Sequence, residues 1–381
     1  GGYEFEVGTE ALQDRLYMND GSGVFISKAE LPDPKTSNSL VLPHDYDGDG
    51  DIDLFVGGRI LPGAYPFEPK SYLLENRDGA YTDVIHSVVP DLEYIGMITD
   101  GEWVDIDGDE KEELVVVGEW MSINIFQVNS DKLVSVTSDY NLETQKGWWQ
   151  SVKVINKNDG FDIVAGNIGR NIKHKASDEK PFHVYASDFD KNNSVDIILA
   201  KYYKDKQVPV RGKDCTTEQM PFIAEKFETF DEFASTDVQN MLGESIKEAK
   251  HFEITTFASK VFSFSAGSNE PEVKDLPIQA QVSSINRILN FDVNEDQSED
   301  LVIAGNLFQT EVETTHQDAG TGLILVNNDD KGFKSINSAS SGFYVPVDVK
   351  DMKLLERTYS KERYVIVTSN DGFIQLFGAN P

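Results

Sequence analysis

Nine-residue acidic segments recur along this chain, and they constrain its fold more than any other feature. The first, at 45–53, reads DYDGDGDID and is followed at once by the apolar run LFVGGR. Carboxylates crowded into a short loop repel one another unless a cation neutralises them. Ca²⁺ takes six to eight oxygen ligands, and alternating aspartates before a glycine wrap such oxygens around one centre. The segment therefore predicts a calcium loop.

The residues that follow decide which kind of calcium loop is expected. An EF-hand requires a bidentate Glu at the twelfth position, which here is Val56, and then a helix. The run after the loop is instead rich in β-branched and aromatic residues, as is typical of a strand. We therefore expect a loop between two β-strands, closed by the carboxylate of Asp53, with the carbonyl of Asp51 as a further ligand.

Three more segments repeat the same slots before an apolar strand, at 105–113, 188–196 and 292–300. Their repetition makes a chance run of acidic residues a poor explanation. We expect about four Ca²⁺ sites, with the first loop the most complete. The predicted metal ligands are Asp45, Asp47, Asp49, Asp51, Asp53, Asp105, Asp107, Asp109, Lys111, Glu113, Asp188, Asp190, Asn192, Ser194, Asp196, Asp292, Asn294, Asp296, Ser298 and Asp300.

A fifth copy at 154–162 has Val154 and Asn156 in the first two slots, so we expect an empty or weak site there. The closing residues of the units recur roughly every 50 residues once an insertion is allowed for. Such periods, with short strands in each unit, indicate a β-propeller. We expect an all-β fold of about six to seven four-stranded blades, with the strands of 181–203 opening the fourth.

The segment at about 216–250 interrupts this pattern, because its apolar residues fall at helical spacing. Thr236 and Asp237 could cap one of the short helices there, and Gly243 marks a break. We expect one helical insertion within a single propeller domain spanning 1–381. The opening strand–turn–strand looks like the second half of a unit, which suggests a segment of a longer secreted protein.

The formal net charge of −32 argues against nucleic-acid grooves and anionic lipid surfaces. No apolar stretch reaches membrane-spanning length, so direct membrane insertion is not expected. Cys215 stands alone, which excludes an intramolecular disulfide. The histidines show no HxxxH or HExxH spacing, so no zinc site is predicted. Calcium loops of this kind suit millimolar extracellular Ca²⁺.

The motifs D-x-D-x-D-G-x-x-D, the following VGG strand and LY-x-N-x-G-x-F resemble the FG-GAP/VCBS repeat propellers. That group includes the integrin α head and bacterial proteins similar to the UnbV and cartilage acidic protein group. DLFVGGRILPGAYP, GEWVDIDGDE, GWWQSV and VAGNIGRN carry the resemblance over nearly the whole chain. The resemblance implies a bacterial propeller that is secreted or on the outer cell surface and has Ca²⁺ in its interstrand loops. It implies a role in binding or assembling partners. The chain departs from the pattern where Glu110, Asn193 and Gln297 replace the loop glycine.

Two functions from different classes remain open. The first is a non-catalytic binding or assembly module for a protein or glycan partner at one propeller face. The alternative is a calcium-dependent polysaccharide lyase or glycoside hydrolase, which needs a carboxylate of raised pKa that is not a calcium ligand. No catalytic residue and no organic cofactor are predicted. Trp148 and Trp149 could offer an aromatic platform for sugar, although packing is the commoner role, and Arg59 and Arg170 could hold an anion or pair with a carboxylate.

Overall fold

The computed structural model describes residues 5–32, 35–310, 316–328, 332–360 and 362–379. These residues form seven antiparallel sheets, and five of them follow one another as blades I to V of a β-propeller. The predicted all-β propeller fold is confirmed, but the described residues form five blades and not the expected six to seven. No helix among the described residues is long and apolar enough to cross a membrane.

Each blade is a meander of adjacent strands. Blade I contains β3 (Ser37–His44), β4 (Asp53–Ile60), β5 (Tyr72–Arg77) and β6 (Ala80–Asp83). Blade II contains β7 (Met97–Val104), β8 (Glu113–Met121), β9 (Asn124–Asn129) and β10 (Lys132–Ser135), with β11 (Gly147–Trp148) also paired to β8. Blade III contains β12 (Ser151–Lys157), β13 (Gly160–Gly166), β18 (Lys260–Ser265) and β19 (Glu272–Asp275).

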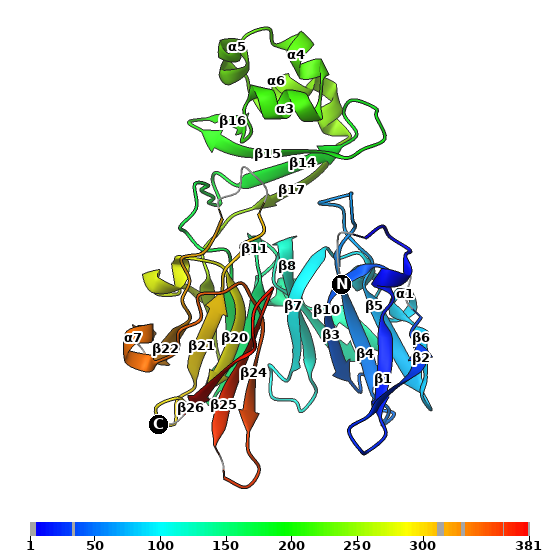
Figure 1. Cartoon of the computed structure of the whole chain (residues 1–381), viewed down its shortest axis with the longest axis vertical. Coiled ribbons are helices and arrows are strands. Elements are labelled where there is room, and N and C mark those ends of the chain that lie inside the picture. Colours follow the sequence, from blue (N-terminus) through cyan, green and yellow to red (C-terminus); the bar gives the residue numbers. More distant parts are fainter. Residues whose placement is uncertain (1–4, 33–34, 311–315, 329–331, 361, 380–381) are drawn as a thin grey trace.

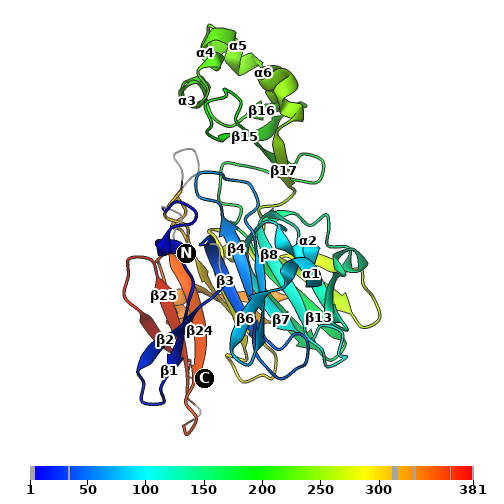
Figure 2. The same cartoon turned by 90° about the vertical axis from the view of Figure 1, so that its right-hand side faces the viewer.

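The last blades complete the series. Blade IV contains β20 (Ile285–Phe291), β21 (Asp300–Gly305), β22 (Leu323–Asn327) and β23 (Phe333–Ile336), and blade V contains β24 (Val349–Glu356), β25 (Arg363–Ser369) and β26 (Gln375–Ala379). A two-stranded sheet, β1 (Arg15–Asn19) and β2 (Phe25–Glu30), lies beside blade I at the right of Figure 1, so it stands in front of blade V in the side view of Figure 2. Its Leu16 packs on the face of blade I that carries Leu74.

Short helical turns connect several of these strands. They are η1 (Glu10–Leu12), α1 (Ile85–Val88), α2 (Pro90–Glu93), η2 (Thr137–Tyr140), η4 (Ile278–Gln281) and α7 (Ser338–Ser341).

The core lies between successive blades. Alternate residues of a strand point to opposite faces, so Ile163 of β13 packs against blade II while its neighbour Val164 packs against blade IV. Blades II, III and IV thus bury apolar side chains against a neighbour on each side, and burying one such side chain stabilises the fold by about 1.5–3 kcal/mol. The glycine that ends the second strand of blade III keeps this packing close. A Cβ at Gly166 would lie 2.6 Å from the carbonyl oxygen of Ile285 in blade IV.

Side chains of the innermost strands also join each blade to the next. At these positions a hydroxyl or amide donates a hydrogen bond to a carbonyl of the following blade. Most of the donors sit at a register shift in their strand, and such bulges re-aim a side chain. The four links are Ser39 to Ile98 (2.7 Å), Thr99 to Trp149 (2.9 Å), Ser151 to Ile285 (2.7 Å) and Asn286 to Val349 (3.0 Å).

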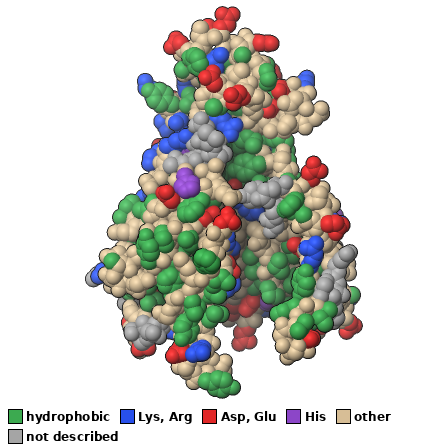
Figure 3. All heavy atoms as spheres, in the orientation of Figure 1, with side chains coloured by type: hydrophobic (Ala, Val, Ile, Leu, Met, Phe, Trp, Pro, Cys, Tyr) green, Lys and Arg blue, Asp and Glu red, His purple; other side chains and the backbone are tan. Residues whose placement is uncertain are grey.

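The chain leaves blade III after β13 and returns at β18. In between it forms a separate sheet of β14 (Phe182–Ser187), β15 (Asp196–Tyr203), β16 (Lys206–Pro209) and β17 (Lys250–Ile254). Helices α3 (Lys213–Gln219), α4 (Phe222–Lys226), α5 (Phe230–Ser235), α6 (Val238–Leu242) and η3 (Gly243–Lys247) cover it. Together these elements form a head subdomain that projects beyond the blades (Figures 1 and 3).

The head subdomain corrects one expectation and supports another. The strands of 181–203 do not open a fourth blade, because β14 pairs with β17 and β15 with β16 while β18 and β19 complete blade III. The helical insertion at about 216–250 is present as α3 to η3. The Asp237 side chain caps α6 by accepting a hydrogen bond from the Asn240 backbone nitrogen at 2.7 Å, and α6 ends at Gly243.

Candidate metal centres

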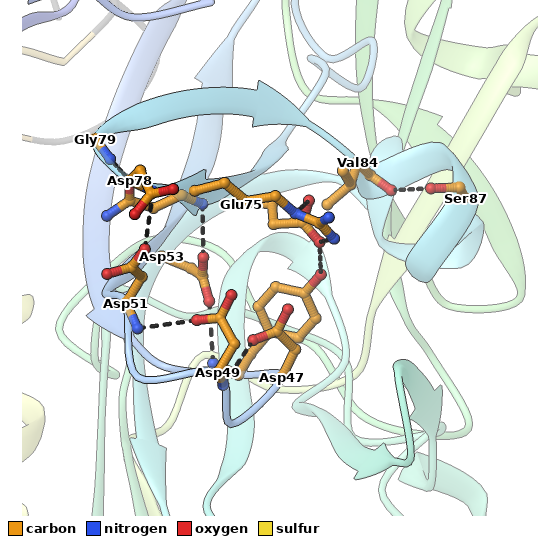
Figure 4. A network of polar contacts seen from close by, with 12 residues as sticks. Asp47, Asp49, Asp51, Asp53, Glu75, Asp78, Gly79, Val84 and Ser87 are labelled. Atoms are coloured by element: carbon orange, nitrogen blue, oxygen red, sulfur yellow. Dashed lines mark hydrogen bonds and ion pairs between the residues drawn. The ribbon is translucent and has the colours of Figure 1, made fainter.

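The first acidic loop, 45–53, connects β3 to β4 and is held by its own carboxylates. The two carboxylate oxygens of Asp45 accept hydrogen bonds from the backbone nitrogens of Gly48 (2.9 Å) and Gly50 (3.0 Å). The Asp53 carboxylate accepts from the nitrogen of Tyr46 at 3.2 Å and from that of Asn76 in β5 at 2.7 Å. Figure 4 shows the part of this network around Asp53, together with the hydrogen bond that the backbone nitrogen of Asp78, in the β5–β6 turn, donates to the Asp51 carboxylate. The loop is therefore tied to the third strand of its blade.

The other three loops repeat the same pattern. In each of them the first carboxylate accepts from the backbone nitrogen of the sixth residue, and the ninth accepts from that of the second. The hydrogen bonds from the sixth to the first residue run from Glu110 to Asp105, Asn193 to Asp188 and Gln297 to Asp292. Those from the second to the ninth residue run from Ile106 to Glu113, Phe189 to Asp196 and Val293 to Asp300. Shared slots in the sequence thus correspond to a shared loop geometry.

Three of the loops bring ligand-type oxygens together. In each, one carboxylate oxygen from the first, third and ninth positions lies within 4.8 Å of the other two. These sets are Asp45, Asp47 and Asp53; Asp105, Asp107 and Glu113; and Asp188, Asp190 and Asp196. Oxygens at this separation can bind one Ca²⁺ at the usual 2.3–2.6 Å. In the fourth loop Asn294 takes the third position, and its amide donates to Asp296 at 2.9 Å.

The fifth and seventh positions of the loops form a second repeated contact. The fifth side chain accepts a hydrogen bond from the backbone nitrogen of the seventh residue. The pairs are Asp51 to Asp49 (2.9 Å), Lys111 to Asp109 (2.9 Å), Ser194 to Asn192 (2.7 Å) and Ser298 to Asp296 (2.9 Å). The predicted carbonyl ligands at the seventh position are therefore held beside the fifth side chain.

The closing carboxylates are buried, so their ionised forms require a positive charge nearby. Asp53, Glu113, Asp196 and Asp300 are each at most 2% exposed. Burial raises the pKa of Asp53 to about 6 and that of Glu113 to about 7. One oxygen of Glu113 is buried without a hydrogen-bond partner among the described residues. A bound divalent cation would supply the missing partner and favour the ionised form, so this donor set fits Ca²⁺.

In the degenerate loop at 154–162, the closing carboxylate has a lysine as its partner. Asp162 is also buried, but the Lys157 ammonium lies 2.5 Å from one of its oxygens. Among the described residues, no lysine or arginine forms an ion pair with the closing carboxylates of the other four loops. Lys157 thus provides within the chain the charge that a metal ion would provide elsewhere, which agrees with the expectation of an empty or weak site.

Backbone strain separates the four loops. The fourth and sixth loop positions have positive φ, a region that favours glycine. The first loop has Gly48 and Gly50 there, with φ of 74° and 95°. The second keeps Gly108 at the fourth position but has Glu110 at φ 68°. The last two loops place non-glycine residues at both positions: Lys191, Asn193, Glu295 and Gln297. The first loop is therefore the least strained.

The remaining candidates from the sequence have structural partners. Trp148 and Trp149 are both buried, so neither forms an exposed platform for sugar. Arg59 pairs with Glu119, and Arg170 pairs with Asp275. These contacts make the arginines ion-pair partners of the chain itself.

Two groups of side chains that could take part in catalysis or metal binding lie outside the acidic loops. Asp100 of β7 is a carboxylate whose pKa burial raises to about 6, although the charge of Arg287 opposes the rise. His183, His251 and Glu253 bring metal-type ligand atoms together in the head subdomain. Spacing rules miss this second group because the two histidines stand 68 residues apart and meet only through strand pairing.

Comparisons with known proteins add little to this geometry. No protein-family model matches the chain, and no curated protein matches it. A solved structure of BBS1N in complex with ARL6DN aligns with a TM-score of 0.29 at 12% identity, covering 90% of this chain and 92% of that one. A mutant of B. megaterium levansucrase aligns with a TM-score of 0.33 at 11% identity, covering 99% of this chain and 86% of that one. The fold assignment therefore rests on the sheets themselves.

Proposed function

We propose that this chain is a calcium-stabilised, non-catalytic β-propeller that binds a protein or glycan partner outside the bacterial cell or on its surface. It belongs on this proposal to the FG-GAP/VCBS type of repeat propeller. The observation that carries the proposal is the fourfold recurrence of one loop geometry, each copy ending in a buried carboxylate. Four such carboxylates are costly to bury without cations.

The position of the loops supports a structural role for the ion. In blades I and IV the closing carboxylate also accepts a hydrogen bond from the third strand, by Asn76 to Asp53 and by Asn327 to Asp300. A cation at these loops would fix the turn between the first two strands and, through the closing carboxylate, the third. Metal binding would in this way contribute directly to folding free energy.

The type of loop supports an extracellular setting. Calcium loops of this kind suit millimolar extracellular Ca²⁺ better than the low calcium level of a cytosol. Two chain segments, 167–181 and 255–259, connect the head subdomain to blade III, and the subdomain projects beyond the blades (Figure 1). We assign partner binding to this subdomain and the adjoining propeller face.

The experiment is a binding and turnover screen with the whole chain. Glycan and surface-protein panels are probed in 2–5 mM Ca²⁺, a concentration range of about the extracellular level, and again in excess EDTA. Saturable binding that is lost in EDTA, with no product formed, supports the proposal. Asp47→Ala should weaken that binding, whereas Asp159→Ala, at an exposed turn of blade III outside the head subdomain, should not. Turnover of any glycan by the purified chain would refute the non-catalytic assignment.

The enzymatic alternative makes a specific prediction about one residue, Asp100. Asp100 has the raised pKa that a general acid or base requires and is not in a calcium loop. It accepts a hydrogen bond from the Val152 nitrogen at 3.1 Å, however, so its observed contact is an interblade link. If the screen detects turnover, Asp100→Asn should abolish it while leaving calcium binding unchanged.

A further inference from the structure

The base of the head subdomain carries a cluster of histidine and glutamate side chains. In the antiparallel pairing of β14 with β17, His183 lies opposite Glu253, and Tyr185 lies opposite His251. Residues two apart in a strand point to the same face. His183, His251 and Glu253 therefore share one face, at the strands that enter and leave the subdomain.

The ligand-type atoms of this cluster converge. Nδ1 of His183 lies 3.0 Å from Nε2 of His251 and 3.8 Å from a carboxylate oxygen of Glu253. All three atoms lie within 4.8 Å of one another. Two imidazole nitrogens bound to a tetrahedral zinc ion at 2.0–2.1 Å stand about 3.3 Å apart. The observed separation is within a few tenths of an ångström of that value.

The surroundings hold two of these groups in place and leave one side open. The ring of Tyr185 stacks on His251 with centroids 4.4 Å apart, and its hydroxyl donates to Gln207 at 3.0 Å. His183 is buried, while His251 is exposed. His251 and Glu253 line a cleft of about 310 Å³ between the head subdomain and blade II. An ion bound here would have a coordination position facing that cleft.

The simpler interpretation is a hydrogen bond between two neutral imidazoles. One ring would then donate to the other, and Glu253 would only pair with Lys146, whose ammonium lies 3.6 Å from its second oxygen. That interpretation gives the Glu253 carboxylate, which lies 3.8 Å from Nδ1 of His183, no role toward the rings.

We infer that His183, His251 and Glu253 bind one transition-metal ion, with Zn²⁺ the best match to two imidazoles and one carboxylate. The donor set distinguishes this site from the calcium loops, because nitrogen ligands favour zinc over calcium. Three protein ligands leave the fourth position open to the cleft. The ion would join β14 to β17 and so fasten the base of the head subdomain.

The test uses the whole chain saturated with Ca²⁺, so that the acidic loops are already filled. Co²⁺ is titrated and the d–d absorption of a tetrahedral nitrogen–oxygen site is recorded, with Zn²⁺ then added in competition. We expect one equivalent of Co²⁺ to bind and one equivalent of Zn²⁺ to displace it. His251→Ala and Glu253→Gln should each weaken binding by about tenfold or more, by analogy with the loss of zinc-site partners.

The matched control is His86→Ala. His86 is an exposed histidine that also contacts a glutamate, Glu93, at 2.9 Å, but it lies in α1, between blades I and II. This variant should bind Co²⁺ as the parent does. Absence of the absorption band in the parent, or equal binding by His251→Ala and His86→Ala, would overturn the assignment. Calcium-dependent melting measured on the same samples shows that the variants are folded and keeps this result separate from the calcium proposal.

Discussion

The carboxylate of Asp53, which closes the first acidic loop, accepts a hydrogen bond of 2.7 Å from the backbone nitrogen of Asn76 in the third strand of the same blade. Blade IV repeats the contact between Asp300 and Asn327 at 2.8 Å. The predicted last ligand of the loop thus also accepts a hydrogen bond from the sheet. Loss of a bound ion should therefore destabilise the blade and not only the loop.

The four loops should differ in their contribution to stability. Asp47→Ala removes a ligand from the least strained loop, and we expect it to lower the free energy of unfolding by about 2–3 kcal/mol in saturating Ca²⁺, the value of one well-occupied site. Asn294→Ala changes a loop with two non-glycine residues at positive φ and should cost less than half as much. Urea unfolding of both variants checks the ranking, and equal effects would contradict it.

The strain at the sixth loop position should be removable. Glu110 adopts φ 68°, a conformation that glycine accepts freely. Glu110→Gly should stabilise the calcium-bound protein by about 0.5–1 kcal/mol. The reciprocal control is Gly50→Ala at φ 95°, which should destabilise it by about 1–2 kcal/mol. Chemical denaturation in Ca²⁺ measures both, and a destabilised Glu110→Gly would show that its side chain contributes more than the strain costs.

Stability without calcium should fall as the pH rises. The pKa of Asp53 is raised to about 6 and that of Glu113 to about 7 by burial, while unfolded carboxyls titrate near 4. A carboxyl with a higher pKa in the folded state favours folding while protonated, so this contribution is present below about pH 4 and is lost as the pH rises through about 7. Melting curves in EDTA from pH 5 to pH 8 should show the decline. In Ca²⁺ the decline should be small, and a calcium-free protein that is more stable at pH 8 than at pH 5 would refute this account.

The interblade links should each be important for stability. Asn286 is buried, and its amide donates to the carbonyls of Asn306 (2.7 Å) and Val349 (3.0 Å). Asn286→Ala leaves both carbonyls without this donor and should cost about 1–3 kcal/mol. The control Asn158→Ala, at an exposed turn of blade III, should change the free energy of unfolding by less than about 0.5 kcal/mol. Equal effects would mean that solvent replaces the interblade bond.

Much of this arrangement can be predicted from short segments of the sequence. The order Asp-x-Asp-x-Asp-Gly and the apolar run after it fix a loop and the strand that follows, because both depend on neighbouring residues. The same holds for the short helices of 216–250, where Asp237 caps α6 as its sequence position suggests. These features need no knowledge of distant parts of the chain.

What the sequence leaves open is the choice of partner strand. The run from Phe182 to Tyr203 has the same acidic loop and the same alternation as the start of a blade, yet it pairs with β16 and β17 in the head subdomain. Blade III is completed instead by β18, which lies far along the chain from β13. Local periodicity cannot distinguish these pairings, and the meeting of His183 with His251 depends on them.

The most direct test of the account is the melting temperature of the chain in Ca²⁺ and in excess EDTA at pH 7.5. If four loops each bind an ion only in the folded state, removing calcium should lower the melting temperature by about 10 °C or more. Readdition of Ca²⁺ should restore it, while Mg²⁺ at the same concentration should restore less, because Mg²⁺ demands a tighter octahedral site. A melting temperature that is the same in Ca²⁺ and in EDTA would contradict the assignment of the loops as calcium sites.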